Sequence, residues 1–596
     1  MKLPKLTDLK ASREFIDVFR GYNHNLRIGD GEFYDMKNLT SDNYPVLSTR
    51  RKRGLLNTLS KPNGMIVAGD TLCIVDGTDF YLGHVKSDLI LTDSPKMLVS
   101  MGGYALIFPD YIYINTLNPN DHGDIGERTI TVECSLCDAE GNKIDYTVSV
   151  TPPSNYSDYS KIWIDTSTIP YTAKMYVSGS WVNWNSMVFV KVSATGIGKY
   201  FRTYRQQEKK LFFFSDTVFV TDTVWPFERV KDDYIIIRGV MGEAESTMMY
   251  VLNYIPSMDF VVESGNRLWG CRYGTLHDFD EDTDEEFTTK INEIYASELG
   301  NFHVWDSSKG VSTDSYSASV GSGGEFTGAI TYQGHPIFFK EKCMHIVYGD
   351  YPSNYHIETV ECPGVNKGSS KSLAIVNGVL YYLSNDGVYA YDGSFPVKVS
   401  TEFGEKRYTS ATAGAFGNKY YISMRGEGES NFSLFVYDTS KGLWYKEDSV
   451  QTIDFAEWKG DLFFTDYADK QIKSVRGESI YIYDEELGDI KVSVLEGKIK
   501  WMAETGIIGI DSPDKKYVSR IDVRLSLEVG AVARIWGQYD SSGEWELLCT
   551  LKGTSLRSFA APIRPKRCDH LRLRFEGEGD VKIFSICKTI EEGSDV

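Results

Sequence analysis

The chain has 596 residues, a hydrophobic fraction of 42% and a formal net charge of −20. This length exceeds what one hydrophobic core supports, and the hydrophobic fraction excludes an intrinsically disordered chain. The acidic balance argues against tight, general binding of DNA, because such proteins lay a basic face on the phosphates. The 38 Tyr, 30 Phe and 53 Gly favour pleated strands and tight turns, so the predicted class is all-β.

The first 60 residues contain no recurring hairpin, and we expect them to form an N-terminal arm and closing segment. Met1–Leu6 lacks the apolar core of a signal peptide, and no apolar run is long enough to span a bilayer. Nine Cys without a secretion signal favour reduced thiols. The sequence therefore predicts synthesis in a cytoplasm and no membrane insertion.

Short aromatic hairpins recur along the chain at a nearly constant spacing. Asn377–Gly393 is an example, with two aromatic strands on either side of an Asp-Gly turn. Glycines that open successive hairpins lie 39 to 44 positions apart within two runs, namely Gly64 and Gly103, then Gly334, Gly378, Gly417 and Gly460. A four-stranded propeller blade requires such a period. We expect a β-propeller of about six to seven blades, divided between residues 61–115 and 199–485.

The spacing fails between Gly103 and Gly265, which are 162 positions apart. Thr129–Val150 and Ile162–Val192 resemble independent strands joined by turns rich in Ser, Pro and Asn. The sequence therefore predicts an inserted β domain at residues 116–198.

Beyond the insertion, Leu211–Phe214 and Val218–Val220 are predicted to resume the propeller. From residue 486 to residue 596 the alternating segments are longer, as in Tyr517–Leu527 and Ala531–Tyr539. This pattern predicts a C-terminal jelly-roll-like β-sandwich.

An acidic loop imitates the first half of an EF-hand, with Asp at loop positions 1, 3, 5 and 7: Asp278, Asp280, Asp282 and Asp284. Thr283 and Thr289 stand where the EF-hand has its Gly and its bidentate Glu. The four Asp are therefore only weak metal candidates, and a solvated or channel-facing loop is the favoured interpretation.

No motif of catalysis or cofactor binding is present. The chain lacks the G-x-S-x-G, H-E-x-x-H and phosphate-loop patterns, so we predict no enzyme and no cofactor, although a glycosidase can place two carboxylates without fixed spacing. Cys134 and Cys137 form one C-x-x-C with no second pair, which is typical of inert thiols. His335 and His345 fall in one predicted blade and are interpreted as packing or rim residues.

Two basic clusters stand against the acidic average and are interaction candidates: Arg50, Arg51, Lys52 and Arg53 near the front, and Arg564, Lys566 and Arg567 in the last domain. Ordinary surface solvation is one interpretation. Docking on an acidic partner, or contact with DNA at one level of a channel, is the other.

Several short segments resemble phage tail propeller proteins: Asn38–Thr40, Tyr44–Arg53, Asn266–Trp269, Ala296–Asn301, Phe338–Glu341, Leu383–Tyr389, Val436–Asp438, Lys516–Arg520, Tyr539–Asp540 and Pro565–His570. The group is similar to the tail nozzle and packaged-DNA stabilization proteins of short-tailed phages. This resemblance covers nearly the whole chain except the insertion.

The resemblance implies a structural virion protein of the tail, assembled in the host cytoplasm as a homo-oligomeric ring that is commonly a hexamer. Such a ring sits below the portal and adaptor proteins, carries a distal needle, spike or tail fibre protein, and passes double-stranded DNA during retention and ejection. Blade periodicity alone does not imply this function. A receptor- or glycan-binding propeller tail protein is the alternative, and a propeller glycosidase is a third possibility.

Overall fold

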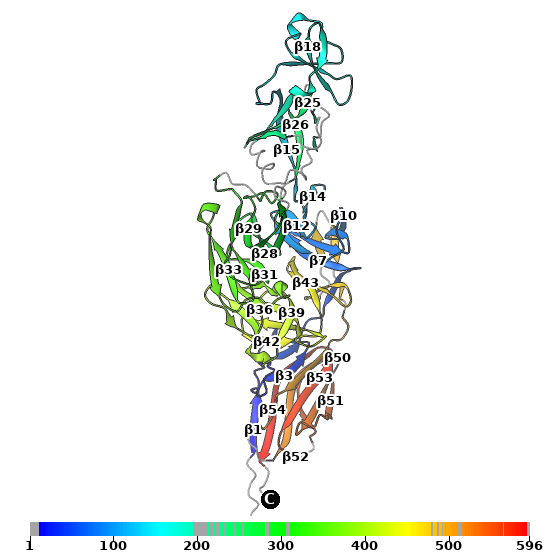
Figure 1. Ribbon diagram of the computed structural model, residues 1–596. Coiled ribbons are helices and arrows are strands. Elements are labelled where there is room, and N and C mark those ends of the chain that lie inside the picture. Colours follow the sequence, from blue (N-terminus) through cyan, green and yellow to red (C-terminus); the bar gives the residue numbers. More distant parts are fainter. Residues whose placement is uncertain are drawn as a thin grey trace, which may run out of the picture.

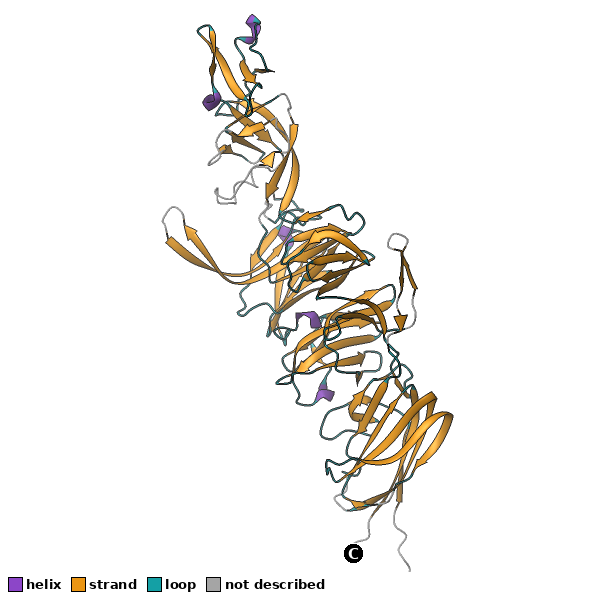
Figure 2. Cartoon of the chain, turned by 90° about the vertical axis from the view of Figure 1, so that its right-hand side faces the viewer, coloured by secondary structure: helices purple, strands orange, loops and turns teal. Residues whose placement is uncertain are grey.

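The computed structural model describes residues 11–194, 212–213, 218–220, 227–231, 233–242, 246–252, 255–280, 285–305, 310–477, 481–484, 488–491, 493–494, 496–510, 515–563 and 566–592. Three regions follow one another along the long axis of the molecule (Figure 1), and strands make up nearly all of their secondary structure (Figure 2). A curved sheet with both ends of the described chain lies at one end, a ring of blades in the middle, and an inserted domain at the other end. No helix in these ranges is long and apolar enough to cross a bilayer.

Seven antiparallel sheets in the described part of the chain form the ring. Six of them consist of four strands that are consecutive in the chain, and the seventh takes its fourth strand from the N-terminal segment. Blade 1 is β7 (Pro62–Ala68), β8 (Thr71–Asp76), β9 (Asp79–Leu82) and β10 (Val85–Ile90), and blade 2 is β11 (Met97–Met101), β12 (Tyr104–Phe108), β13 (Ile112–Asn115) and β14 (His122–Asp124). Blade 3 is β27 (Phe260–Ser264), β28 (Arg267–Asp280), β29 (Glu285–Ala296) and β30 (Tyr316–Ser319), and blade 4 is β31 (Gly328–Tyr332), β32 (His335–Phe339), β33 (Cys343–Tyr348) and β34 (His356–Glu361). Blade 5 is β35 (Ala374–Val376), β36 (Val379–Ser384), β37 (Gly387–Tyr391) and β38 (Val397–Lys398), and blade 6 is β39 (Tyr408–Phe416), β40 (Lys419–Gly426), β41 (Phe432–Asp438) and β42 (Leu443–Lys446). Blade 7 is β43 (Thr452–Trp458), β44 (Asp461–Asp466), β45 (Gln471–Ser474) and β6 (Gly54–Thr58), with β48 (Ser493–Val494) added outside.

Aromatic and branched side chains of neighbouring blades meet in shared hydrophobic clusters. One cluster joins Phe339 of blade 4 to Tyr382 of blade 5, and another joins Phe463 of blade 7 to Met65 of blade 1. Phe339, Tyr382 and Phe463 are completely buried. A single four-stranded blade buries neither face, so this packing against both neighbours is what makes each hairpin pair stable. The predicted propeller is therefore confirmed.

The N-terminal segment closes the ring. Strand β6 pairs antiparallel with β45, with Gly54 opposite Ser474 and Thr58 opposite Gln471, so it is the fourth strand of the last blade. The inner strand β43 of that blade contacts β7 of blade 1. The closing segment predicted for residues 1–60 is thus a strand that joins the beginning of the chain to the last blade.

The inserted domain lies between β14 and β27 and is larger than predicted. Its main sheet has the order β21 (Phe212–Phe213), β26 (Ser246–Leu252), β15 (Glu127–Cys137), β20 (Phe189–Ser193), β24 (Tyr234–Ile237) and β23 (Phe227–Val230). A tip sheet consists of β16 (Tyr146–Ser149), β17 (Ile162–Asp165), β18 (Thr172–Val177) and β19 (Ser180–Asn183), and a ribbon pairs β22 (Val218–Val220) with β25 (Gly239–Met241). Short 3₁₀ turns are η1 (Tyr156–Asp158) and η2 (Asn185–Met187) here, and η4 (Pro352–Asn354), η5 (Ser370–Ser372) and η6 (Thr401–Phe403) in the ring.

Two predicted boundaries are therefore wrong. The insertion extends to Leu252 and not to residue 198, because Phe212–Phe213 pairs with β26 and Val218–Val220 pairs with β25. The propeller resumes only at β27, near residue 260. A run of two or three apolar residues fits a strand of the inserted domain and a strand of a blade equally well, because strand periodicity does not specify the partner strand.

The C-terminal unit is one 11-stranded sheet of the described chain that curves into a nearly closed, barrel-like sandwich. Its own strands are β49 (Lys500–Thr505), β50 (Lys516–Tyr539), β51 (Glu546–Ala561), β52 (Arg567–Cys568), β53 (Leu571–Glu578) and β54 (Val581–Glu592). The N-terminal arm supplies the other five, β1 (Ala11–Ile16), β2 (Gly21–Tyr22), β3 (Glu32–Lys37), β4 (Leu39–Thr40) and β5 (Leu47–Thr49). A separate hairpin, β46 (Tyr481–Asp484) with β47 (Gly488–Lys491), precedes this sheet, which begins at Lys500 and not at residue 486.

The 24-residue strand β50 makes the curvature. Its first half pairs with β54 and its second half with β53, while β51 follows it on the other edge. The change of partner falls between Leu527 and Val532, where Gly530 has a φ of +82°. A bend of this kind lets one strand serve two packed layers.

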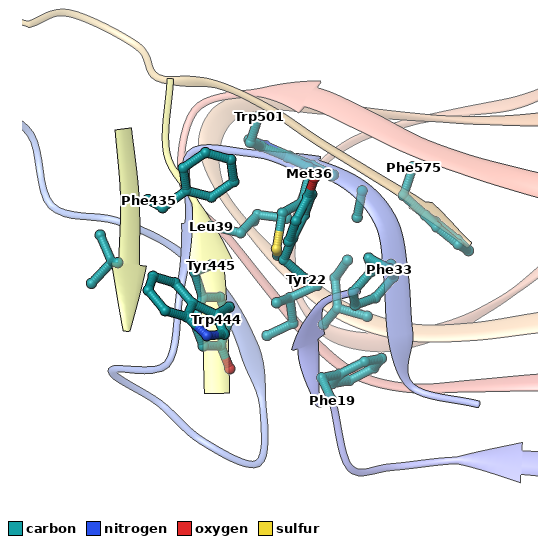
Figure 3. Close-up of a cluster of buried hydrophobic side chains, with 14 of the residues drawn as sticks. Phe19, Tyr22, Phe33, Met36, Leu39, Phe435, Trp444, Tyr445, Trp501 and Phe575 are labelled. Atoms are coloured by element: carbon teal, nitrogen blue, oxygen red, sulfur yellow. The ribbon is translucent and has the colours of Figure 1, made fainter. Parts of the chain in front are cut away.

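A continuous core joins the propeller to the C-terminal sheet (Figure 3). Trp444 and Phe435 of blade 6 pack in the same buried cluster as Phe33 of the N-terminal arm and Phe575 of β53. Strands β2, β3 and β4 all contact β42, so the arm is the layer between the two units. Gly21 makes this approach possible, because its φ is +77° and a Cβ there would lie 2.2 Å from the Trp444 carbonyl oxygen.

Candidate functional site

A cleft of about 450 Å³ lies where blades 6 and 7 meet the N-terminal arm. Its walls carry six cationic and three acidic side chains, which is the reverse of the charge balance of the whole chain. The cationic residues are Arg50, Arg51, Arg53, Lys419, Lys441 and Arg476, and the acidic ones are Asp42, Asp438 and Glu447. Two residues of the predicted front cluster, Arg50 and Arg53, form its deep wall.

Arg50 and Arg53 are buried and paired within the chain. The Nη1 of Arg53 lies 2.6 Å from Asp448 Oδ2, and its Nη2 lies 2.8 Å from Glu447 Oε2. Both Nη atoms of Arg50 donate hydrogen bonds to the Glu496 carboxylate, at 2.6 Å and 2.8 Å. We call these five residues the arginine junction, since it ties the arm to blade 6 and to the segment before the C-terminal sheet.

Electrostatics in the arginine junction favour the charged forms of its acids. Burial alone would raise the pKa of Asp448, but the guanidinium groups of Arg53 and Arg50 outweigh burial and hold that pKa below its ordinary value. Burial would also raise the pKa of Glu496, but the hydrogen bonds and the charge of Arg50 outweigh burial and lower that pKa below its ordinary value. Bidentate Arg–carboxylate pairs of this kind fix geometry as well as charge.

The outer wall of the cleft is also internally paired. Lys419 contacts Asp42, and Lys441 lies 3.0 Å from Asp438. Asp438 is only 2% exposed and accepts a hydrogen bond from Ser41 at 2.5 Å, so blade 6 and the arm share this carboxylate. The arrangement joins blade 6 to the N-terminal arm, and the cationic side chains on the cleft walls outnumber the acidic ones by six to three.

The predicted interaction candidates have different positions in the structure. Arg50 and Arg53 are not surface docking residues, because their guanidinium groups are buried in the arginine junction. Arg51 is exposed and Lys52 is half-buried beside them. Lys566 pairs with Glu546 and Arg567 is exposed on β52, while Arg564 lies outside the described residues.

The predicted acidic loop lies at the end of a long hairpin. Strands β28 and β29 stay paired as far as Asp280 opposite Glu285, well past the point where β27 and β30 end. Asp278 and Asp280 therefore belong to a strand by their backbone, and not to an EF-hand loop, while Asp282 and Asp284 lie outside the described residues. No cluster of three His, Cys, Asp or Glu in the described ranges has the geometry of a metal site.

The two thiols of the C-x-x-C pattern, Cys134 and Cys137, lie on opposite faces of β15. Cys134 packs with Val132 and Leu136, whereas Cys137 packs with Phe189 and Ile236. Burial raises the pKa of Cys134 to about 11 and that of Cys137 to about 12. They cannot bind one metal together, and their thiols are unreactive near neutral pH.

His345 is a packing residue of blade 4, as predicted. Its ring is completely buried, with Nε2 2.7 Å from Ser322 Oγ and Nδ1 2.9 Å from Thr359 Oγ1. Burial, assisted by the nearby Lys340 ammonium, lowers the pKa of His345 to about 4. His335 lies on the same blade with its ring 4.8 Å from that of Tyr348.

We expect His345 to make the protein acid-sensitive. The folded state resists protonation down to about pH 4, whereas the unfolded chain takes up the proton near pH 6.5, so stability is lost as the pH falls between these values. The loss at pH 4 is about 3 kcal/mol. Urea unfolding of wild type and His345→Gln at pH 7 and pH 4 measures it, and the variant should lose correspondingly less.

Ser322→Ala is the control for this prediction, because it removes a hydrogen bond to the ring and keeps the histidine. It should lower stability at both pH values and preserve the difference between them. An equal pH dependence in wild type and His345→Gln would contradict the assignment.

Sequence reasoning missed the acids of the arginine junction. Glu447 and Asp448 directly follow β42, in which Trp444 and Tyr445 are buried, and two adjacent acids at a strand end were the only available signal.

Comparisons with known proteins give no family. No family model matches the chain, and no curated protein matches it significantly. Among solved structures, the chain is similar to an exo-β-1,3-galactanase from Phanerochaete chrysosporium, at 9% identity and a TM-score of 0.20, covering 55% of this chain and 95% of that one. It is also similar to the extracellular domain of a proposed hybrid two-component system from B. thetaiotaomicron, at 11% identity and a TM-score of 0.24, covering 92% of this chain and 91% of that one.

A GH43 glycoside hydrolase with an engineered active site matches at 9% identity and a TM-score of 0.18, covering 56% of this chain and 96% of that one. All three TM-scores lie below 0.5, so these likenesses carry no argument about function.

Proposed function

We propose that the chain is a non-enzymatic structural protein of a bacteriophage tail, which assembles into a ring that extends the DNA channel. The observation that carries this proposal is the rod-like arrangement of the molecule (Figure 1). The two ends of the described chain and the inserted domain lie at opposite ends of the molecule, and the propeller shares one core with the C-terminal sheet. A protomer of this shape spans a fixed distance between the end that would attach to the tail assembly and the opposite end.

The charge supports the same proposal. A net charge of −20 disfavours adhesion to phosphates, so DNA can pass a wall of such protomers without being gripped. The cleft beside the arginine junction carries more cationic than acidic side chains on its walls, and this supports docking of an acidic neighbour, either a second copy or a portal or adaptor protein. The resemblance of the flanking motifs to tail nozzle proteins points in the same direction.

Electron microscopy of the purified full chain, alone and mixed with the portal and adaptor proteins of its virion, tests the proposal. We expect closed rings with a bore wide enough for duplex DNA, and no tight DNA retention at physiological salt. Persistent monomers that bind glycans and never join the portal assembly would instead support the receptor- or glycan-binding alternative.

A further inference from the structure

The tip sheet of the inserted domain, at the free end of the molecule, has an unusual surface (Figure 1). Six of the exposed large hydrophobic side chains of the described residues lie between positions 150 and 187: Val150, Tyr156, Ile169, Val177, Val182 and Met187. Val177 and Val182 lie on strands of the tip sheet, and the other four lie in the loops and 3₁₀ turns beside it. Scattered exposed apolar residues need no explanation, but their concentration at one end of the molecule indicates a contact surface.

One face of the tip sheet is accounted for by folding. Ile162 and Ile164 of β17 and Ala173 of β18 point into the core that the tip sheet shares with the main sheet of the insertion. Successive residues of a strand face opposite sides, so Trp163, Lys174 and Tyr176 lie on the other face. That second face has no sheet packed on it among the described residues.

Five aromatic rings follow one another across this second face, and we call them the aromatic ladder: Trp163, Trp181, Tyr176, Tyr159 and Tyr156. Tyr159 stacks on Tyr176 with ring centroids 4.1 Å apart and planes 9° apart, and Trp163 meets Trp181 edge-on at 5.4 Å. The ladder is buried at Trp163, which is 3% exposed, and opens at Tyr156, which is 91% exposed. A row of rings held by its buried end presents its outer rings in a fixed orientation.

The charges around the ladder are already satisfied. Residues 146–190 contain four charged side chains, and these form two pairs, Lys161 with Asp158 at 2.9 Å and Lys174 with Asp165 at 2.6 Å. The net charge of this stretch is zero in a chain of net charge −20. An ionic ligand would find no unpaired partner in this stretch, whereas an uncharged one meets no desolvation penalty from it.

The remaining polar groups on the ladder face are hydroxyls and amides. Asn183 is opposite Lys174, and Thr172 is opposite Asp165, so both point to the ladder side of the sheet. Rigid aromatic rings beside Thr, Ser and Asn combine apolar contact with neutral hydrogen bonding. The C–H faces and hydroxyl groups of a sugar ring match these two features.

We propose that the aromatic ladder is a binding platform for an uncharged saccharide, with Tyr156 and Tyr159 stacking on the sugar. This binding activity is additional to the proposed ring and does not depend on it. The tip sheet lies at the end of the molecule opposite the two ends of the described chain, so the platform would contact a saccharide-bearing surface ahead of the propeller.

Affinity electrophoresis of the full chain tests the proposal, in native gels that contain a neutral glucan, galactan or mannan. At least one of these polysaccharides should retard the wild type, and Tyr156→Ala should bind about tenfold more weakly, the loss of one aromatic stacking contact. Tyr156→Phe should bind like wild type, because it keeps the ring. Tyr159→Ala, which removes the ring between Tyr156 and Tyr176, should bind at least as weakly as Tyr156→Ala.

Tyr467→Ala is the matched control, since Tyr467 is a 60% exposed tyrosine in the propeller, and it should bind like wild type. Tyr156 is almost fully exposed, so its removal should leave thermal unfolding unchanged. Retardation by none of the three polysaccharides, or equal retardation of wild type and Tyr156→Ala, overturns the proposal. Tyr156-dependent binding to phosphatidylcholine vesicles without any polysaccharide binding would also overturn it and assign the ladder to a lipid surface. Each of these results leaves ring formation to be judged separately by microscopy.

Discussion

Arg53→Met is expected to lower the free energy of unfolding by about 3–5 kcal/mol, because it leaves the buried carboxylate of Glu447 and the largely buried one of Asp448 without their principal partner. Arg53 lies 2.6 Å from Asp448 and 2.8 Å from Glu447, and its side chain is 4% exposed. Chemical denaturation at pH 7 measures the loss. Since the arginines keep the pKa of Asp448 low, the stabilisation is present above the ordinary carboxyl pKa and disappears as the pH falls below it.

Two further variants make this prediction specific. Arg53→Met combined with Glu447→Gln should recover part of the lost stability, because one uncompensated charge is removed. Lys61→Met breaks a surface pair with Asp93 at 2.7 Å, in which both side chains are about half exposed, and should change stability by about 1 kcal/mol or less. Equal effects of Arg53→Met and Lys61→Met would show that the arginine junction contributes no more than a surface pair.

Trp444→Ala is expected to cost about 3–5 kcal/mol and to uncouple the propeller from the C-terminal sheet. Trp444 is completely buried, packs against Phe403 with ring centroids 4.7 Å apart, and donates from Nε1 to the Val399 carbonyl oxygen at 2.6 Å. Removing the indole opens a cavity in the core of Figure 3 and leaves that carbonyl without its partner. Calorimetry should show one transition in wild type and two in the variant.

Trp458→Ala is the matched control. Trp458 is also buried and donates to the Asp70 carbonyl oxygen at 2.7 Å, but it joins blade 7 to blade 1 inside the ring. It should destabilise the propeller to a similar degree without the uncoupling signature. A single transition in Trp444→Ala would mean that the arm alone holds the two units together.

The propeller could be predicted because its information is local. The hairpin expected at the Asp-Gly pair forms, with Asn385 and Asp386 as its two turn residues, because Ser384 is opposite Gly387. The end of the insertion could not be predicted, since β22 and β25 resemble blade strands in composition and differ only in their partners.

The site shows the same limit. Arg50 and Arg53 belong to a run of four basic residues that reads as a solvated surface, whereas their acidic partners are about 400 positions away: Arg53 and Asp448 are 395 positions apart. Pairing over such distances leaves no local signal. The aromatic ladder did leave one, in the local density of Tyr and Trp and the balanced charge of residues 146–190, but aromatic residues are frequent throughout this chain.

The position of the arm has a consequence for the order of folding. Strand β6 cannot pair until β45 is synthesised, about 400 residues later. Strand β1 pairs with β54, with Ala11 opposite Glu591. Most of the sheet that holds the arm therefore cannot form until nearly the whole chain has left the ribosome, whereas the insertion finds all its partners within residues 127–252. Contacts of such high sequence separation slow folding and leave strand edges exposed meanwhile. The arm is thus made before nearly all of its partner strands and is among the last parts to become ordered.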